Sequence, residues 1–177
     1  MMSLFQNSDI MQALYTTLLV AVISAVIAVL IGTCAAVGIF YLNRRLKSLL
    51  MNVTYLPMLN SEIVTGISLL VLYMFLGIPL GRVSLLLAHI TFNIPYVILS
   101  VTPKLVQLDR FVFEAAQDLG ATPVQAFFKV ILPEISPGIV TGFILAFTMS
   151  IDDFVISFFT AGPGVSTLSL SIYSMAK

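Results

Sequence analysis

Charged residues are scarce in this sequence, and their scarcity excludes most classes of protein. Only 9% of the 177 residues are charged and 59% are hydrophobic, whereas about a quarter of the residues in a soluble protein are charged. A soluble protein is therefore excluded, and the chain is predicted to lie in a membrane. The acidic and basic residues are equal in number, so the chain lacks the basic face that a nucleic-acid partner requires.

Cysteine and histidine are each present only once, which limits the chemistry that the chain can support. Cys34 lies in an apolar stretch without a partner, so a disulfide framework and a cysteine-based metal site are excluded. His89 has no second histidine to share a metal, and a lone histidine on an apolar helix usually forms a hydrogen bond to a neighbouring helix. We therefore predict that the chain holds no metal and no cofactor.

Signatures of enzymes are missing as well. No glycine precedes a lysine, so the phosphate-binding Gly-x-x-x-x-Gly-Lys-Ser/Thr loop does not occur. The His-Glu-x-x-His and Gly-x-Ser-x-Gly patterns are also absent from the sequence. We predict that the chain is not an enzyme and has no catalytic residues.

Four apolar segments are long enough to cross a bilayer, which takes about 20 residues. They are residues 11–41, 49–79, 83–103 and 137–161. Basic residues follow the first and the third segment, so both connections are predicted to be cytoplasmic; these residues are Arg44, Arg45, Lys47, Lys104, Arg110 and Lys129. No linker or repeat divides the chain, and residues 1–177 are predicted to form one all-α, polytopic transmembrane domain.

Several residues predict bent helices that pack closely. Pro57 with residues 60–62 interrupts the second segment, and Asn93 with Pro95 interrupts the third. Proline is tolerated in a membrane helix where neighbouring helices or water satisfy the freed carbonyl, so kinked helices around a cavity are expected. Small residues predict close helix contacts; they are Gly138 and Gly142 in one segment and Gly32, Ala35 and Ala36 in another.

One polar stretch, residues 105–134, lies between the third and fourth segments and is predicted to form a cytoplasmic helical hairpin. Gly120 can adopt the left-handed conformation that ends a helix. Thr122 can cap the next helix, with Pro123 at its first position and Gln125 at capping-box spacing. These signals predict two short helices with a break, and by themselves they also fit an ordinary amphipathic loop.

Acidic residues within the predicted segments point to a polar path. A charge at the bilayer centre costs at least about 2.5–3.5 kcal/mol, so such residues normally face a cavity, an ion or a partner. Glu62, Asp152 and Asp153 are three acids, and the segments contain no lysine or arginine, which suits a path for a cation. Adjacent helical residues point about 100° apart, so we expect one of Asp152 and Asp153 to line the path and the other to pair or cap nearby. A purely structural role for all three acids remains the alternative.

The hairpin sequence resembles the loop by which permease subunits of bacterial ABC importers dock on their ATPase. The matching residues are Glu114, Ala115, Ala116, Gly120, Leu132 and Pro133, with Val130 in place of the family's usual isoleucine. The resemblance implies the type I ABC importer permease fold, a multi-pass location in the bacterial inner membrane, and coupling to ATP hydrolysis through these residues. It also implies two ATP-binding subunits, a sister permease, an extracytoplasmic binding protein and surrounding lipid as partners.

The resemblance covers nearly all of residues 8–177, which correspond to the central part of a six-span permease. We therefore expect a product that lacks the first and last spans, with a genuine four-span protein and a non-functional remnant as alternatives. Residues 61–70, 149–157, 162–163 and 172–175 resemble the spermidine/putrescine branch. This implies a polyamine cargo with Glu62, Asp152 and Asp153 along its path. Ferric iron, thiamine and aminoethylphosphonate are alternative cargoes, and a secondary transporter or cation channel would leave the hairpin unexplained.

Overall fold

The computed structural model describes residues 8–108 and 111–176, and all regular secondary structure in these residues is helical. The longer helices are α1 (Ser8–Phe40), α2 (Arg44–Leu59), α3 (Glu62–Phe75), α4 (Arg82–Gln107) and α7 (Leu132–Asp152). The shorter helices are α5 (Phe111–Asp118), α6 (Pro123–Ala126), the π-helical turn η1 (Phe127–Ile131), α8 (Val155–Thr160) and α9 (Leu168–Ala176). The fold is thus all-α, as the composition predicts.

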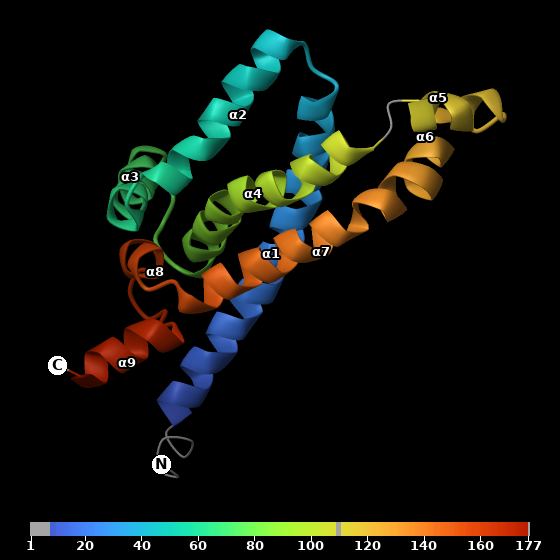
Figure 1. Ribbon diagram of the computed structural model, residues 1–177. Coiled ribbons are helices and arrows are strands. Elements are labelled where there is room, and N and C mark those ends of the chain that lie inside the picture. Colours follow the sequence, from blue (N-terminus) through green and yellow to red (C-terminus); the bar gives the residue numbers. More distant parts are fainter. Residues whose placement is uncertain (1–7, 109–110, 177) are drawn as a thin grey trace.

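Helices α1, α4 and α7 cross one another at the centre of the molecule, and each contacts the other two (Figure 1). Val97 of α4 is fully buried at this crossing. A Cβ atom added to Gly32 of α1 would lie 2.7 Å from the Val97 side chain, and one added to Gly142 of α7 would lie 3.3 Å from the Val97 Cα. The predicted close contacts at these glycines are therefore confirmed, and the missing side chains are what allow the helices to approach.

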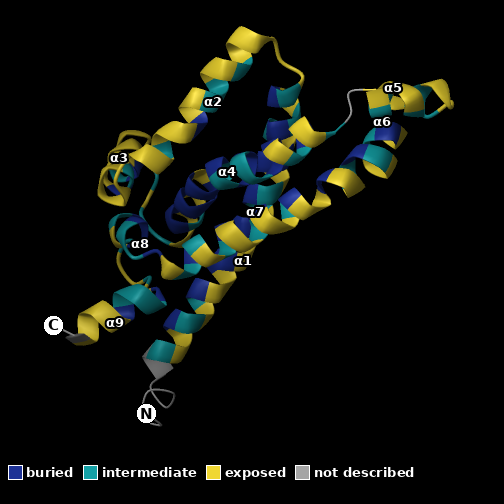
Figure 2. Cartoon of the chain, in the orientation of Figure 1, coloured by how far each residue is buried: buried dark blue, intermediate teal, exposed yellow. Residues whose placement is uncertain are grey.

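The helices α1, α4 and α7 differ in how far their residues are buried (Figure 2). Of the three helices, α4 is the most buried, while α1 and α7 leave much of their apolar surface exposed. Large exposed hydrophobic residues lie along α1, α3 and α7, for example Leu30, Phe75 and Ile144. Such surface suits lipid or another subunit, because the described part of this chain leaves it uncovered.

The predicted second segment, residues 49–79, consists of two helices. Helix α2 begins at Arg44 and ends at Leu59, and α3 leaves it at an angle of 107°. Asn60 has an extended backbone, and the Ser61 hydroxyl caps α3 by accepting a hydrogen bond from the Val64 amide at 3.4 Å. The described residues thus contain three helices able to cross a membrane, or four if this bent pair is one span.

The predicted fourth segment, residues 137–161, is also divided. Helix α7 ends at Asp152, and α8 begins at Val155. Asp153 has an extended backbone, with φ −66° and ψ 116°. Its carboxylate accepts hydrogen bonds from the Ile156 and Ser157 amides of α8. Asp153, which the sequence places within one continuous helix, therefore lies at the start of a second helix.

The hairpin forms largely as its local signals predict. Gly120 has φ 88° and separates α5 from α6. Thr122 caps α6, and the Thr122 amide donates to the Gln125 side chain at 3.1 Å, which completes the predicted capping box. The second arm continues without interruption through η1 into α7, so that residues Pro123–Asp152 form one helical rod. Helix α4 extends to Gln107, three residues into the range predicted for the hairpin.

Candidate functional site

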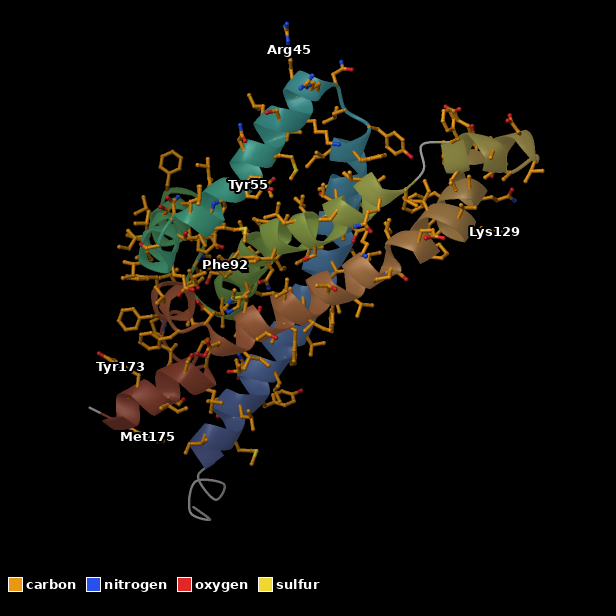
Figure 3. The ribbon with its side chains drawn as sticks, viewed as in Figure 1. Arg45, Tyr55, Phe92, Lys129, Tyr173 and Met175 are labelled. Atoms are coloured by element: carbon orange, nitrogen blue, oxygen red, sulfur yellow. The ribbon has the colours of Figure 1, made fainter. Side chains whose placement is uncertain are left out.

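The hairpin lies at one end of the helical bundle, together with the end of α4 and the turn between α1 and α2 (Figure 1). Figure 3 shows the basic residues Arg45 and Lys129 in the upper part of the view and Tyr173 of α9 in the lower part. Because basic residues mark the cytoplasmic ends of membrane helices, the end that carries the hairpin is the one predicted to face the cytoplasm.

The residues of the hairpin motif are largely exposed. Glu114, Ala115 and Gly120 are on the surface, and Ala116 is partly buried. Leu132 and Pro133 are the first two residues of α7. The structure thus divides the motif between the tip of the hairpin and the base of the rod. Pro133 is exposed, whereas Leu132 is partly buried and packs against the hydrophobic core, so the hairpin tip is the part of the motif that another protein can reach most readily.

Exposed apolar side chains at the hairpin tip are a feature that the motif did not reveal. Leu119 is 90% exposed and Val124 is 64% exposed, on the two sides of the Gly120 turn. Helix α5 has no buried residue. An apolar side chain at a tip predicted to face the cytoplasm is typical of a surface that binds a protein partner. The exposure of Leu119 could not be read from the sequence, because it depends on the hairpin projecting from the bundle.

A cavity of about 580 Å³ separates the hairpin from the turn between α1 and α2. Tyr41 and Phe113 bring their rings to 6.3 Å across it, and the Lys47 ammonium lies 4.8 Å from the centre of the Phe40 ring. Glu114 also lines this cavity. The hairpin therefore contacts the residue that follows α1 through one aromatic pair, and a cavity lies beside this contact.

The three acids predicted for a cargo path have different surroundings. Asp153 is buried at the junction of α7 and α8, whereas Asp152 and Glu62 are exposed. Each exposed acid lies at a helix break: Asp152 is the last residue of α7, and Glu62 is the first residue of α3.

The two breaks belong to neighbouring helices. Helix α3 packs on α8, and a Cβ atom added to Gly66 would lie 2.8 Å from the Phe159 ring. On α4, Tyr96 forms an aromatic pair with Phe92, at 5.3 Å between ring centres.

Buried polar residues join the three central helices. The Asn93 amide donates to the Ser150 hydroxyl at 2.7 Å, and the Ser24 hydroxyl lies 3.1 Å from the same oxygen. These residues come from α4, α7 and α1, and all three are buried. Asn93 was predicted to interrupt a helix, whereas Ser24 and Ser150 gave no signal because an uncharged serine is common in apolar helices.

His89 is buried on α4, beside Asp153. Its Nε2 atom lies 3.5 Å from the Asp153 Oδ2 atom, and its Nδ1 atom lies 2.9 Å from the Leu85 carbonyl oxygen. The histidine therefore contacts a neighbouring helix, which is the type of role expected for a lone histidine. Within the described residues, no group of three or more histidine, cysteine, aspartate or glutamate side chains could hold a metal ion.

Comparison with known proteins decides the family. The family model described as "Binding-protein-dependent transport system inner membrane component" matches residues 28–176. The chain belongs to this family. The predicted resemblance, the inner-membrane location and the all-α polytopic fold are thereby confirmed.

Three members of this family show how far the similarity extends. The spermidine/putrescine transport system permease protein PotC of Escherichia coli K12 is 43% identical over 174 residues, covering 98% of this chain and 66% of that protein. PotC of Haemophilus influenzae is 38% identical over 174 residues, and the matched region covers 68% of that protein. The putrescine transport system permease protein PotI of Escherichia coli K12 is 37% identical over 181 residues and is covered to 64%. The chain thus spans about two thirds of the length of these relatives.

Proposed function

We propose that this chain is a transmembrane permease subunit of an ABC importer, which moves linear polyamines across the bacterial inner membrane with energy from ATP hydrolysed by another subunit. One observation carries the proposal. The exposed hairpin with Glu114, Ala115 and Gly120 is continuous with a helical rod that ends at an acidic helix break. A partner at one end of this rod can therefore affect the region where a cation would pass.

The hairpin surface supports an ATP-binding partner. Leu119 and Val124 present apolar side chains beside the motif, and closure of two ATP-binding subunits would move the hairpin. Such a movement drives transport only if the closed ATPase favours one permease conformation over the other. A sister permease and an extracytoplasmic binding protein complete the proposed complex, and the exposed apolar faces of α1 and α3 suit the sister subunit and lipid.

The two exposed acids support a polycationic cargo. Glu62 and Asp152 lie at breaks in two helices that could span the membrane, and discontinuous helices often form binding sites in transporters. A carboxylate can offset part of the cost of removing water from an ammonium group. The relatives named for spermidine and putrescine agree with this choice. Ferric iron, thiamine and aminoethylphosphonate are the competing cargoes.

Uptake into proteoliposomes tests the proposal. The chain is reconstituted with its neighbouring permease, ATP-binding and binding-protein subunits, and labelled spermidine is supplied outside. We expect uptake that requires ATP and the ATP-binding subunit, and that unlabelled putrescine reduces. Uptake without ATP would contradict the importer and favour a channel or secondary transporter. ATP-dependent uptake of thiamine, iron or a phosphonate, without uptake of spermidine, would overturn the cargo.

Replacement of the exposed acids should weaken cargo binding. Asp152→Asn and Glu62→Gln each remove one charge, and an interaction with a charged group is worth about 1.5–3 kcal/mol, or roughly a 10- to 100-fold increase in KM for spermidine. The maximal rate should change less. Glu134→Gln is the matched control, because Glu134 is an exposed acid at the opposite end of α7. Unchanged KM in both acid variants would remove these acids from the path.

A further inference from the structure

Asp153 is satisfied entirely from within the chain. Its Oδ1 atom accepts a hydrogen bond from the Ile156 amide at 3.1 Å, and its Oδ2 atom accepts from the Ser157 amide at 2.8 Å and the Ser157 hydroxyl at 2.9 Å. Three donors to one side chain are typical of an ionised carboxylate, which accepts hydrogen bonds and donates none. Asp153 is therefore a charged, buried acceptor for amides in the first turn of α8, one residue before the N-cap position.

His89 has one ring nitrogen whose proton is determined by its partner. The Leu85 carbonyl oxygen can only accept a hydrogen bond, so the Nδ1 atom, 2.9 Å away, must donate. The other nitrogen, Nε2, faces the Asp153 Oδ2 atom at 3.5 Å. An unprotonated Nε2 would bring a lone-pair nitrogen within 3.5 Å of a carboxylate oxygen, and both side chains are at most 3% exposed, so little water is available to screen the repulsion.

A proton on Nε2 removes this conflict. With both nitrogens protonated, His89 is an imidazolium that forms an ion pair with Asp153. Within residues 8–108 and 111–176, no lysine or arginine lies within ion-pair distance of Asp153. The histidine is therefore the neighbouring group that can balance this buried charge, which would otherwise remain uncompensated.

Two further contacts fix the same junction. The Ser84 hydroxyl of α4 donates to the Thr160 carbonyl at the end of α8, at 2.8 Å. The Ser169 hydroxyl of α9 donates to the Asp153 carbonyl at 2.9 Å. Helix α8 is thus attached to α4 at both of its ends, at its start through His89 and at its finish through Ser84.

We propose that His89 is a positioning residue: its imidazolium neutralises Asp153 and holds the junction of α7 and α8, so that Asp152 alone provides a free carboxylate at this break. The role of Asp152 in this statement rests on the proposed function, whereas the charge and the position of His89 do not. Two adjacent acids would then have separate tasks. Asp153 holds the helix break in place, and Asp152, the exposed last residue of α7, meets the cargo.

Nuclear magnetic resonance can test the charge of His89 without any transport. Because His89 is the only histidine, the chain labelled with ¹⁵N-histidine, purified through a tag free of histidine and reconstituted in lipid with unlabelled partner subunits, gives one pair of imidazole signals. We expect both nitrogens to carry protons at neutral pH. In Asp153→Asn, we expect the Nδ1-protonated neutral form. A neutral imidazole in the unmodified chain would overturn the proposal.

A double-mutant cycle tests the coupling between the two residues. We expect His89→Gln to lower the maximal uptake rate of the complex at least about tenfold, since it leaves the buried Asp153 charge without its partner. Asp153→Asn, in which His89 becomes neutral, should lower this rate by no more than about threefold, through loss of the carboxylate that accepts from the α8 amides. The double variant carries no charge at either position and should recover to within about threefold of the unmodified complex. Additive losses in the double variant, or full activity in His89→Gln, would contradict the pairing.

The Michaelis constant separates the tasks of the two acids. Surviving activity of His89→Gln and Asp153→Asn should show an unchanged KM for spermidine, whereas Asp152→Asn should show a raised KM. A raised KM and a normal maximal rate in Asp153→Asn would mean that Asp153 contacts the cargo, which overturns the division of tasks. If the unmodified complex shows no polyamine uptake, the proposed function fails, while the imidazole signals still decide the state of His89.

Discussion

Gly120→Val is expected to abolish the coupling of ATP hydrolysis to transport while the chain still inserts and assembles. Gly120 has φ 88°, and the turn around it closes with hydrogen bonds from the Gly120 amide to Gln117 and from the Ala121 amide to Ala116. A β-branched residue in this left-handed conformation costs about 1–3 kcal/mol. Nothing lies within 4 Å of an added Cβ atom, so the strain is local and changes the shape of the hairpin only.

The measurement compares polyamine uptake with phosphate release in the same proteoliposomes. We expect uptake to fall at least about tenfold, since even 1.4 kcal/mol at a coupling contact corresponds to a factor of ten, while phosphate release continues. Gly120→Asn is the matched control, because asparagine tolerates the left-handed conformation and should retain most of the transport. Normal transport by Gly120→Val would contradict the role of this turn.

Contact between hairpin and ATPase can be read separately by cross-linking. In a Cys34→Ala background, a cysteine introduced at the exposed Ala115 can carry a photoreactive group. We expect this group to capture the ATP-binding subunit, and we expect the same group at Ser166, near the opposite end, to miss it. Capture of lipid alone from position 115 would contradict the docking role of the hairpin.

Gly138→Val should have the largest effect on stability. An added Cβ atom at Gly138 would lie 2.9 Å from the Ser100 carbonyl oxygen and 3.2 Å from the Val101 Cα atom. Both atoms belong to the backbone of α4, which cannot move aside without separating α4 from α7. Overpacking typically costs about 1–3 kcal/mol, and valine adds two further methyl groups to the clash. We expect loss of the purified complex, measured by thermal denaturation in detergent with size-exclusion detection.

Gly38→Ala provides a control for which the expected change in stability has the opposite sign. Gly38 is exposed in α1, and nothing lies within 4 Å of an added Cβ atom. Alanine in a helix is favoured over glycine by about 0.5–1 kcal/mol, so this variant should be unchanged or slightly more stable. If Gly138→Val denatures at the same temperature as Gly38→Ala, the close contact of α4 with α7 is wrong.

Features that depend on local chemistry were accessible from the sequence. The Gly120 turn and the capping box of Thr122 with Gln125 follow from rules that involve only a few neighbouring residues. The long helix α1 follows from an unbroken apolar stretch, whereas α4 continues through Asn93 and Pro95, where an interruption was predicted. Close helix packing at the small residues Gly138 and Gly142 was also predicted, although the helix that packs against them, α4, was not.

Features that depend on long-range contacts were not accessible. Residues 151–154 are compatible with a continuous helix, and the break occurs because Asp153 finds the amides of α8 and the ring of His89. The 107° bend between α2 and α3 likewise exceeds a proline kink, because the chain becomes extended at Asn60. Ser24 joins Ser150 across 126 residues of sequence, and no local pattern indicates such a partner.

The π-helical turn η1 sets the rotational phase between the two ends of the rod. Residues Pro123–Asp152 form 30 helical residues, about 45 Å at 1.5 Å per residue. A single π turn accommodates one residue more than an α turn does, and one residue corresponds to about 100° of rotation. The azimuth of Asp152 relative to the hairpin therefore depends on Phe127–Ile131, and a twist of this turn would reorient the acid with no need for the rod to bend.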